Sequence, residues 1–204
     1  MISDTKVVAI GGGTGLSTML KGLKLHTHNI TAVVTVADDG GSSGILRSDL
    51  GMLAPGDVRN CVSALAEVDP VMGELLNFRF KDGSLKGHSL GNLFLAALNE
   101  TSSSFDEAVK KFSHLTGVVG TVYPVTNESV TLSALLEDGR LIEGESHIGV
   151  HHDGPKNGIV KLMVNPEKPK AVDGVIKALE KADIIVLGPG SLYTSIIPNL
   201  LVDG

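Results

Sequence analysis

The amino-acid sequence predicts an α/β fold with a mostly parallel sheet that carries helices on both faces. Two apolar runs, residues 6–10 and 183–187, each end at a glycine-rich loop, residues 11–15 and 188–191. Residues 16–23 follow the first loop with apolar side chains at helical spacing. Near-continuous apolar strands that alternate with helices are typical of a parallel sheet buried on both faces.

Composition narrows the class of protein. The 204 residues suffice for one domain with a sizeable core, and 42% of them are hydrophobic, as in globular proteins. The formal net charge of −6 argues against a general nucleic-acid binder, and an aromatic content of 3% argues against stacking platforms for bases or sugars. No apolar run reaches the ~18 residues of a membrane span. The single cysteine, Cys61, excludes an internal disulfide, so we expect a cytoplasmic protein.

The predicted elements follow the chain in order. After the first strand and helix, residues 30–36 form a second buried strand that ends at Asp38 and Asp39. Ser104 stands three residues before Glu107, which is the capping-box spacing at a helix start. Four helices are predicted in this part of the chain, and they start near Pro55, Pro70, Ser89 and Ser104.

The second half of the chain predicts a small antiparallel region and a last parallel strand. Apolar alternation over 130–136, the turn Asp138-Gly139 and the return over 141–145 indicate a β-hairpin. Residues 158–164 form a further strand, and residues 171–182 form a helix that leads to the last strand. We expect a single domain, residues 1–204, with an insertion at about 104–165.

The loop Gly11–Gly15 has the chemistry of a phosphate site. Consecutive glycines let several backbone N–H groups point at one anion, the following helix adds its positive end, and Thr14 adds a hydroxyl donor. The dinucleotide fingerprint is met only in part, because Leu16 stands where close packing favours Gly or Ala. No Lys-Ser/Thr pair completes a P-loop. A tight turn without a ligand is the alternative, but three adjacent glycines exceed what a turn needs.

Two carboxylates and a second glycine loop follow the other parallel strands. Asp38 or Asp39 could accept hydrogen bonds from ribose hydroxyls or hold Mg²⁺ beside a phosphate. The alternative is that Asp38 caps the following turn and Asp39 is solvated. The loop at residues 188–191 offers a second anion site, and open α/β sheets bind ligands at this edge. Two such loops could hold a diphosphate, and the acidic pair could hold its sugar.

Three other patterns have weaker chemical interpretations. Residues 87–91 spell the nucleophile elbow G-x-S-x-G, but the polar segment before them predicts no strand, which favours Ser89 as a helix N-cap. Asp57 and Arg59 lie at a predicted helix start, where they could meet an anion or form an ordinary ion pair. The exposed loop that starts at His151-His152-Asp153 lacks the further ligands of a tetrahedral site, so we predict no zinc site.

Five characteristic strings follow one another along the chain: VAIGGGTGL at 8–16, TVADDGGSSG at 35–44, PGDVRN at 55–60, GHSLGNL at 87–93 and LGPGSLYTS at 187–195. Together they resemble the bacterial gluconeogenesis factor family, and they span nearly the whole chain. That family is related to 2-phospho-L-lactate transferase, which handles a guanosine diphospho-lactate donor. The relationship implies a Rossmann-like sheet with an embedded helical and β-hairpin insertion.

The resemblance implies a cytoplasmic factor needed for normal cell shape and peptidoglycan wall synthesis during growth on gluconeogenic carbon sources. Members of the family bind UDP-sugars such as UDP-N-acetylglucosamine, with no settled catalytic activity. The first glycine loop would contact the diphosphate, and Asp38 and Asp39 would face the nucleotide or a metal. By this resemblance the cleft is lined by Gly11, Gly12, Gly13, Thr14, Gly15, Asp38, Asp39, Gly40, Ser42, Ser43, Asp57, Arg59, Asn60, His88, Asn92, Gly188, Gly190 and Ser191.

Two functions follow from these patterns. The favoured one is a nucleotide-sugar-binding regulatory factor, because no obvious nucleophile, base or metal cluster stands beside the loops. The alternative is a phosphotransferase of the 2-phospho-L-lactate transferase type that uses Asp38 and Asp39 to hold Mg²⁺. Residues 55–60 depart from the acidic Pro-Asp-type signatures of that transferase, which puts its chemistry in doubt.

The sequence also gives expectations about ligands, partners and length. A UDP-sugar is the expected ligand, no cofactor is firmly implied, and neither a nucleic-acid partner nor a membrane span is expected. A homodimer is compatible with the sequence. The chain stops at residue 204, where a helix after the last strand would end, whereas family members continue. We therefore expect a shortened version that lacks part of the sugar or base pocket.

Overall fold

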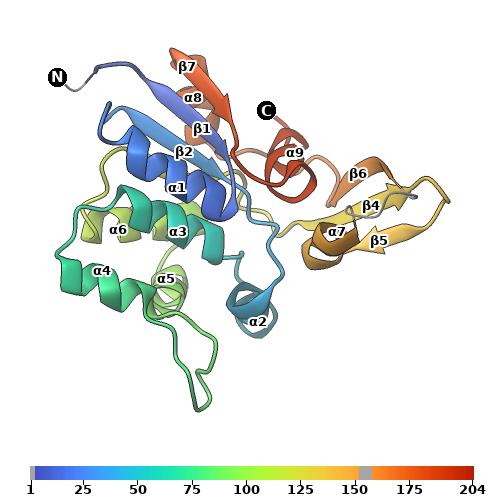
Figure 1. Cartoon of the computed structure of the whole chain (residues 1–204), viewed down its shortest axis with the longest axis horizontal. Coiled ribbons are helices and arrows are strands. Elements are labelled where there is room, and N and C mark those ends of the chain that lie inside the picture. Colours follow the sequence, from blue (N-terminus) through green and yellow to red (C-terminus); the bar gives the residue numbers. More distant parts are fainter. Residues whose placement is uncertain (1–2, 152–157) are drawn as a thin grey trace.

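The computed structural model describes residues 3–151 and 158–204 and confirms the α/β class (Figure 1). Four parallel strands form the main sheet, in which β1 and β2 are central and β3 and β7 lie at the two edges. The register places Val7 of β1 beside Ile30 of β2 and Ile184 of β7. In sheet order the strands are β3 (Thr121–Pro124), β2 (Ile30–Val34), β1 (Val7–Gly11) and β7 (Ile184–Leu187).

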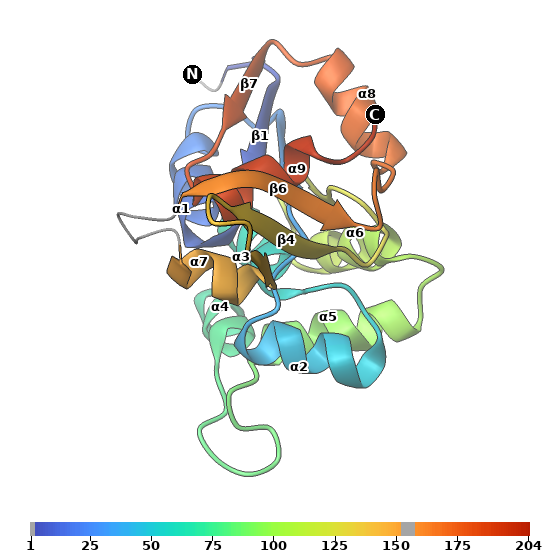
Figure 2. The same cartoon turned by 90° about the vertical axis from the view of Figure 1, so that its right-hand side faces the viewer.

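Helices cover both faces of this sheet because successive strand residues point to opposite sides. Ala9 of β1 packs in the core beneath α1 (Gly13–Leu23), α3 (Gly56–Leu65) and α6 (Phe105–Leu115). Its neighbours Val8 and Ile10 pack on the other side, with Val175 of α8 (Asp173–Glu180). Figures 1 and 2 show α8 on the opposite side of the sheet from α1 and α3.

The predicted helices of the middle region are confirmed. The Oγ of Ser89 accepts a hydrogen bond from the Asn92 backbone N–H at 3.2 Å, and so caps its helix as predicted. The Oγ of Ser104 accepts from the Glu107 N–H at 3.4 Å, but the Glu107 carboxylate bonds the N–H of Ser103 rather than that of Ser104. The helix capped by Ser89 is α5 (Leu90–Glu100), and the one capped by Ser104 is α6. The region also contains α2 (Gly41–Leu50) and α4 (Pro70–Asn77).

The predicted hairpin is also confirmed, and it belongs to a separate antiparallel sheet. Its strands β4 (Thr131–Leu136) and β5 (Leu141–Glu143) are joined by a turn in which Gly139 has a φ of +84°. The predicted strand after it is β6 (Ile159–Asn165), which pairs with the other edge of β4. The helix α7 (Glu145–His151) follows β5 and begins in the segment predicted as the returning strand (Figure 1). Residues 152–155 of the predicted exposed loop lie outside the described residues.

Three features differ from the sequence-based expectation. Residues 41–44, expected in a loop, are the first turn of α2, which tertiary hydrogen bonds to α5 hold in place. The strand β3 is too short to give a periodic signal. The strand β7 is about half exposed at Ile184, Ile185 and Leu187, because it is an edge strand of the described sheet.

The chain then continues into a π-helical turn (Leu192–Ile196) and α9 (Ile197–Leu200). No helix in the described ranges is long and apolar enough to cross a bilayer.

Candidate functional site

The two glycine loops lie in contact at the carboxyl ends of the neighbouring strands β1 and β7. A Cβ atom added to Gly15 would lie 3.0 Å from the carbonyl oxygen of Pro189, and one added to Gly190 would lie 2.9 Å from the Cβ of Ser195. The side-chain amide of Asn199 donates to the Gly11 carbonyl at 3.1 Å and so fixes the first loop to α9. The sequence-predicted loops therefore form one edge, where Gly15 packs tightly on the second loop and Gly190 packs on Ser195 of the turn that follows it.

The start of α1 contains an acidic side chain that the sequence interpretation placed only in the cleft lining. Gly12 precedes α1 and provides no side-chain cap, while the Asp57 carboxylate accepts a hydrogen bond from the backbone of Gly13. A Cβ on Gly12 would lie 2.8 Å from an Asp57 carboxylate oxygen and 2.6 Å from the Thr35 methyl carbon. Asp57 thus lies where a phosphate oxygen would meet the helix N-terminus.

Burial and a neighbouring carboxylate shift the ionisation of Asp57. Burial raises the pKa of Asp57 most, the charge of Asp38 raises it further, and the hydrogen bond from Gly13 opposes both, with a result of about 7. Burial also raises the pKa of Glu145 at the start of α7, against a hydrogen bond with Thr194 that lowers it. Near neutral pH the Asp57 carboxyl is therefore divided between its neutral and charged forms, and the neutral form can donate a proton.

Asp38 and Asp39 have different partners. One oxygen of Asp38 accepts from the Gly40 N–H at 2.9 Å, so Asp38 caps the turn as the alternative had it, whereas Asp39 is not simply solvated. The two oxygens of Asp39 accept from the N–H groups of Glu145 at 2.8 Å and Ser146 at 2.9 Å. Asp39 therefore caps α7 and fixes the antiparallel sheet to the end of β2. No group of three or more His, Cys, Asp or Glu residues within the described ranges could hold a metal ion. A Mg²⁺ ion held by Asp38 and Asp39 beside a phosphate stays a prediction.

Other residues of the predicted cleft form a buried hydrogen-bond chain between α2, α3 and α5. The Oγ of Ser42 lies 2.9 Å from the His88 Nδ1 and accepts from the Asn92 amide at 3.1 Å. The Asn92 carbonyl oxygen accepts from the Arg59 Nε at 3.3 Å, and a terminal nitrogen of Arg59 donates to Asn77 at 2.7 Å. Arg59, His88 and Asn92 are all less than 8% exposed. Arg59 bonds to amides here and forms no ion pair with Asp57 among the described salt bridges.

The last predicted residues occupy supporting places. Ser43 accepts from the Gly56 N–H at 3.2 Å and so links α2 to the start of α3. Thr14 is exposed on the first turn of α1, and Asn60 is half-buried on α3. Glu145 and Thr194 were not among the predicted site residues. Glu145 comes from a segment far from the glycine motifs and outside the five strings, whereas Thr194 lies within the string at 187–195, three residues after Ser191.

The fold and the site define a class of protein: an α/β protein with a Rossmann-like sheet. Its glycine loops lie at the carboxyl ends of parallel strands, and carboxylate side chains lie beside them. The chain belongs to the family described as 2-phospho-L-lactate transferase CofD, whose model matches residues 7–204. It is 48% identical over 200 residues to the gluconeogenesis factor of Bacillus subtilis (strain 168). The aligned residues cover 97% of this chain and 61% of that protein. The gluconeogenesis factor of Halalkalibacterium halodurans is 48% identical over 201 residues, with coverages of 97% and 61%.

Solved structures agree with these relatives. The crystal structure of protein BH3568 from Bacillus halodurans superposes with a TM-score of 0.93 at 46% identity, over 99% of this chain and 64% of that one. The resemblance seen in the five strings is therefore confirmed at the level of the family. The chain spans 42% to 62% of the length of the curated relatives it matches.

Proposed function

We propose that this chain forms the phosphate-binding part of a nucleotide-sugar site, with a UDP-N-acetylglucosamine-like ligand, in a regulatory factor for cell shape and wall synthesis during gluconeogenic growth. The observation that carries the proposal is the contact between the two glycine loops at the ends of β1 and β7. One loop opens α1, where Gly12 brings no capping side chain and the Gly13 N–H is bonded to Asp57, a contact that an anion would replace. Backbone N–H groups and a helix N-terminus together suit a diphosphate.

Asp57 gives this proposed site a pH dependence. A diphosphate that approaches α1 meets a carboxyl whose pKa is about 7. When Asp57 is charged it repels the ligand and competes for the Gly13 amide, and when it is neutral it can donate a hydrogen bond to a phosphate oxygen. Binding is therefore tighter at pH 6 than at pH 8.

Phosphotransfer is less well supported by the site. The family description names a transferase, and the neutral form of Asp57 could supply a proton to a phosphate oxygen. However, Asp38 and Asp39 point to separate backbone partners, and no metal cluster is formed within the described ranges. Ligand binding without turnover is therefore the function that we favour.

Isothermal titration calorimetry with UDP-N-acetylglucosamine tests this proposal on the chain itself and, in parallel, on the longer Bacillus subtilis relative. We expect binding that weakens between pH 6 and pH 8 and a nucleotide that mass spectrometry finds intact afterwards. Gly12→Ala should abolish binding, because its Cβ would lie 2.6 Å from Thr35 and 2.8 Å from Asp57. Gly22→Ala is the matched control on the same helix, since no atom lies within 4 Å of its Cβ position.

The outcomes separate the two functions. Absence of heat from both proteins at millimolar ligand would refute nucleotide-sugar binding. Release of a nucleoside monophosphate would show turnover and favour the transferase alternative. Binding that is as strong in Gly12→Ala as in Gly22→Ala would place the ligand away from the glycine loops.

A further inference from the structure

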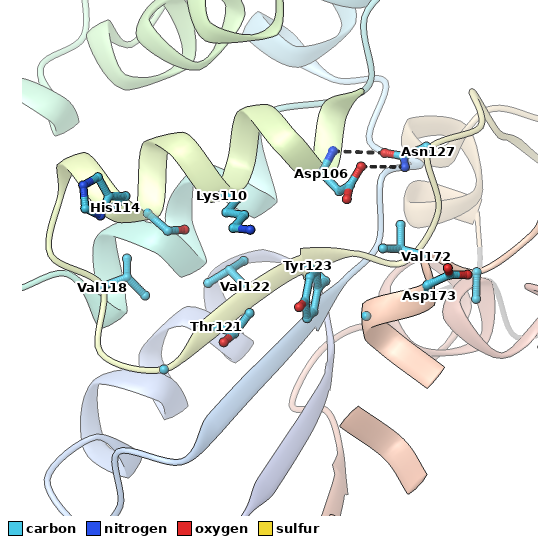
Figure 3. A pocket seen from close by; sticks show the side chains of 14 residues that line it. Asp106, Lys110, His114, Val118, Thr121, Val122, Tyr123, Asn127, Val172 and Asp173 are labelled. Atoms are coloured by element: carbon cyan, nitrogen blue, oxygen red, sulfur yellow. Dashed lines mark hydrogen bonds between the residues drawn. The ribbon is translucent and has the colours of Figure 1, made fainter. Parts of the chain in front are cut away.

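A cavity of about 650 Å³ lies along β3 at the edge of the sheet opposite to β7. Figure 3 shows it between α6 on one side and the start of α8 on the other, with β3 as its floor. Strand β2 stands between the cavity at β3 and the first glycine loop at the end of β1, and the second loop is one strand further away. We name it the β3 groove, and its lining includes Lys110, His114, Thr121, Val122, Tyr123 and Asp173.

The floor of the β3 groove is an incomplete sheet edge. Within the described ranges β3 pairs only with β2, so its outer edge has no strand partner. The chain just beyond β3 is already paired on that edge: Thr126 forms an antiparallel bridge with Ala171, and the Val172 N–H donates to the Val125 carbonyl at 3.0 Å. The segment that pairs here, Ala171 and Val172, extends no further along β3 because α8 begins at Asp173. The edge beside residues 121–123 is consequently left open.

The open edge offers main-chain hydrogen bonds. The Val125 N–H donates to Val34 of β2 at 2.9 Å, and backbone groups alternate between the two sides of a strand. The N–H and C=O of Val122 therefore point away from β2 and toward the groove. An extended segment that continued the direction of Ala171 and Val172 would run antiparallel to β3 and meet these groups.

Charge is distributed unevenly along the groove. Lys110 and His114 lie one turn apart on the same face of α6, near the end of the groove where β3 begins (Figure 3). Asp106 and Asp173 lie at the other end, near Tyr123 and Val172. Lys110 takes part in neither of the salt bridges found in the described residues. The groove is thus cationic at one end and anionic at the other.

We propose that the β3 groove binds an extended peptide segment of a partner protein, which adds to β3 as an antiparallel strand. Its N-terminal end lies beside Asp106 and Asp173 and carries a basic side chain, and its C-terminal end lies beside Lys110 and His114 and carries an acidic one. Strand addition suits this geometry because main-chain bonds provide affinity while the walls select side chains. A second copy of this chain fits less well, since its own α6 and α8 would flank its β3 and meet the walls of the groove.

Two synthetic peptides of identical composition test the proposal on the intact chain labelled with ¹⁵N. Acetyl-Lys-Val-Thr-Val-Glu-amide has the proposed polarity, and acetyl-Glu-Val-Thr-Val-Lys-amide has the reverse. We expect the first peptide to bind more tightly and to slow hydrogen exchange at the Val122 amide. Lys110→Glu should weaken its binding about fivefold, as expected for a partly exposed ion pair. Lys177→Glu makes the same change of charge at an exposed position of α8 that does not line the groove, and should leave binding unchanged.

Several results would overturn the proposal. Equal binding of the two peptides, or no protection of Val122 by either at millimolar concentration, would exclude antiparallel strand addition. Concentration-dependent self-association that Lys110→Glu abolishes would identify a second copy as the occupant. Equal effects of Lys110→Glu and Lys177→Glu would show that only the net charge of the chain matters.

Discussion

Replacement of Asp57 by Asn tests the central electrostatic feature of the glycine-loop site. The pKa of Asp57 rises from an ordinary 3.8 to about 7 in the folded chain, mainly through burial and then through the charge of Asp38. Between these two values the folded protein binds a proton that the unfolded chain has lost. Stability therefore falls as the pH rises from about 4 to about 7 and levels off above that. Asn removes this titration and keeps an oxygen that can accept from Gly13.

The magnitude follows from the size of the shift. A shift from 3.8 to about 7 corresponds to about 4 kcal/mol of lost stability at high pH, at about 1.4 kcal/mol per pKa unit. Between pH 5 and pH 8, where the unfolded carboxyl is ionised throughout, about 2.5 kcal/mol of this loss develops. We compare the free energy of unfolding of Asp57→Asn with that of the native chain. The difference in favour of the variant should be about 2.5 kcal/mol larger at pH 8 than at pH 5.

Urea denaturation followed by far-ultraviolet circular dichroism measures this difference at both pH values. Any constant effect of the new amide group cancels, because only the change with pH is compared. Asp49→Asn is the control, since Asp49 is exposed on α2 and its replacement reports the general effect of losing one negative charge. A gain for Asp57→Asn that is the same at pH 5 and pH 8 would refute the argument that folding leaves Asp57 neutral up to about pH 7.

Three other predictions follow from single contacts. Asn92→Ala should cost about 1–3 kcal/mol in chemical denaturation, because it leaves buried partners unpaired, and Asn99→Ala on the same helix should cost less. Asp39→Ala should speed hydrogen exchange at the first amides of α7 and leave α1 protected; unchanged exchange there would show that the cap is dispensable. Burial raises the pKa of the Cys61 thiol well above its usual range, so a disulfide reagent at pH 8 should modify Cys61 only after unfolding, and rapid reaction of the native chain would contradict this.

Much of the fold could be predicted because local signals were strong. The runs at 6–10 and 30–36 are rich in apolar and β-branched residues, since β1 and β2 are buried on both faces. Ser89 and Ser104 predicted their helices because the caps use bonds within one turn. By contrast, β3 has four residues and ends at Pro124, so its position depends on pairing with β2 rather than on any pattern of its own.

The predicted adjacency of the two glycine loops is observed, whereas the partners of the predicted side chains were not foreseen. Glycine positions report backbone geometry, which a sequence displays directly, and the loops at Gly11 and Gly188 do lie side by side. A side chain's partner depends on tertiary contacts. Asp39 was expected to face a nucleotide or solvent, yet it binds the start of α7, more than a hundred residues away in the chain. Arg59 was expected to meet an anion or to pair with Asp57, and in the structure its side chain donates to the amide oxygens of Asn92 and Asn77.

The position of Asp57 links ligand binding to a proton in a measurable way. A diphosphate at the start of α1 would place negative charge beside a carboxyl whose pKa is already about 7. That charge raises the pKa of Asp57 further, so binding near neutral pH must take up a fraction of a proton from the solvent. Calorimetry in buffers of different ionisation enthalpy measures this uptake, and Asp57→Asn should abolish it while it strengthens binding at pH 8. A binding factor stops at this protonated complex, whereas a phosphotransferase must pass the proton on. Asp57 is the residue that a phosphotransferase would use as its acid. Proton uptake by Asp57 without cleavage of the nucleotide would therefore favour the binding function.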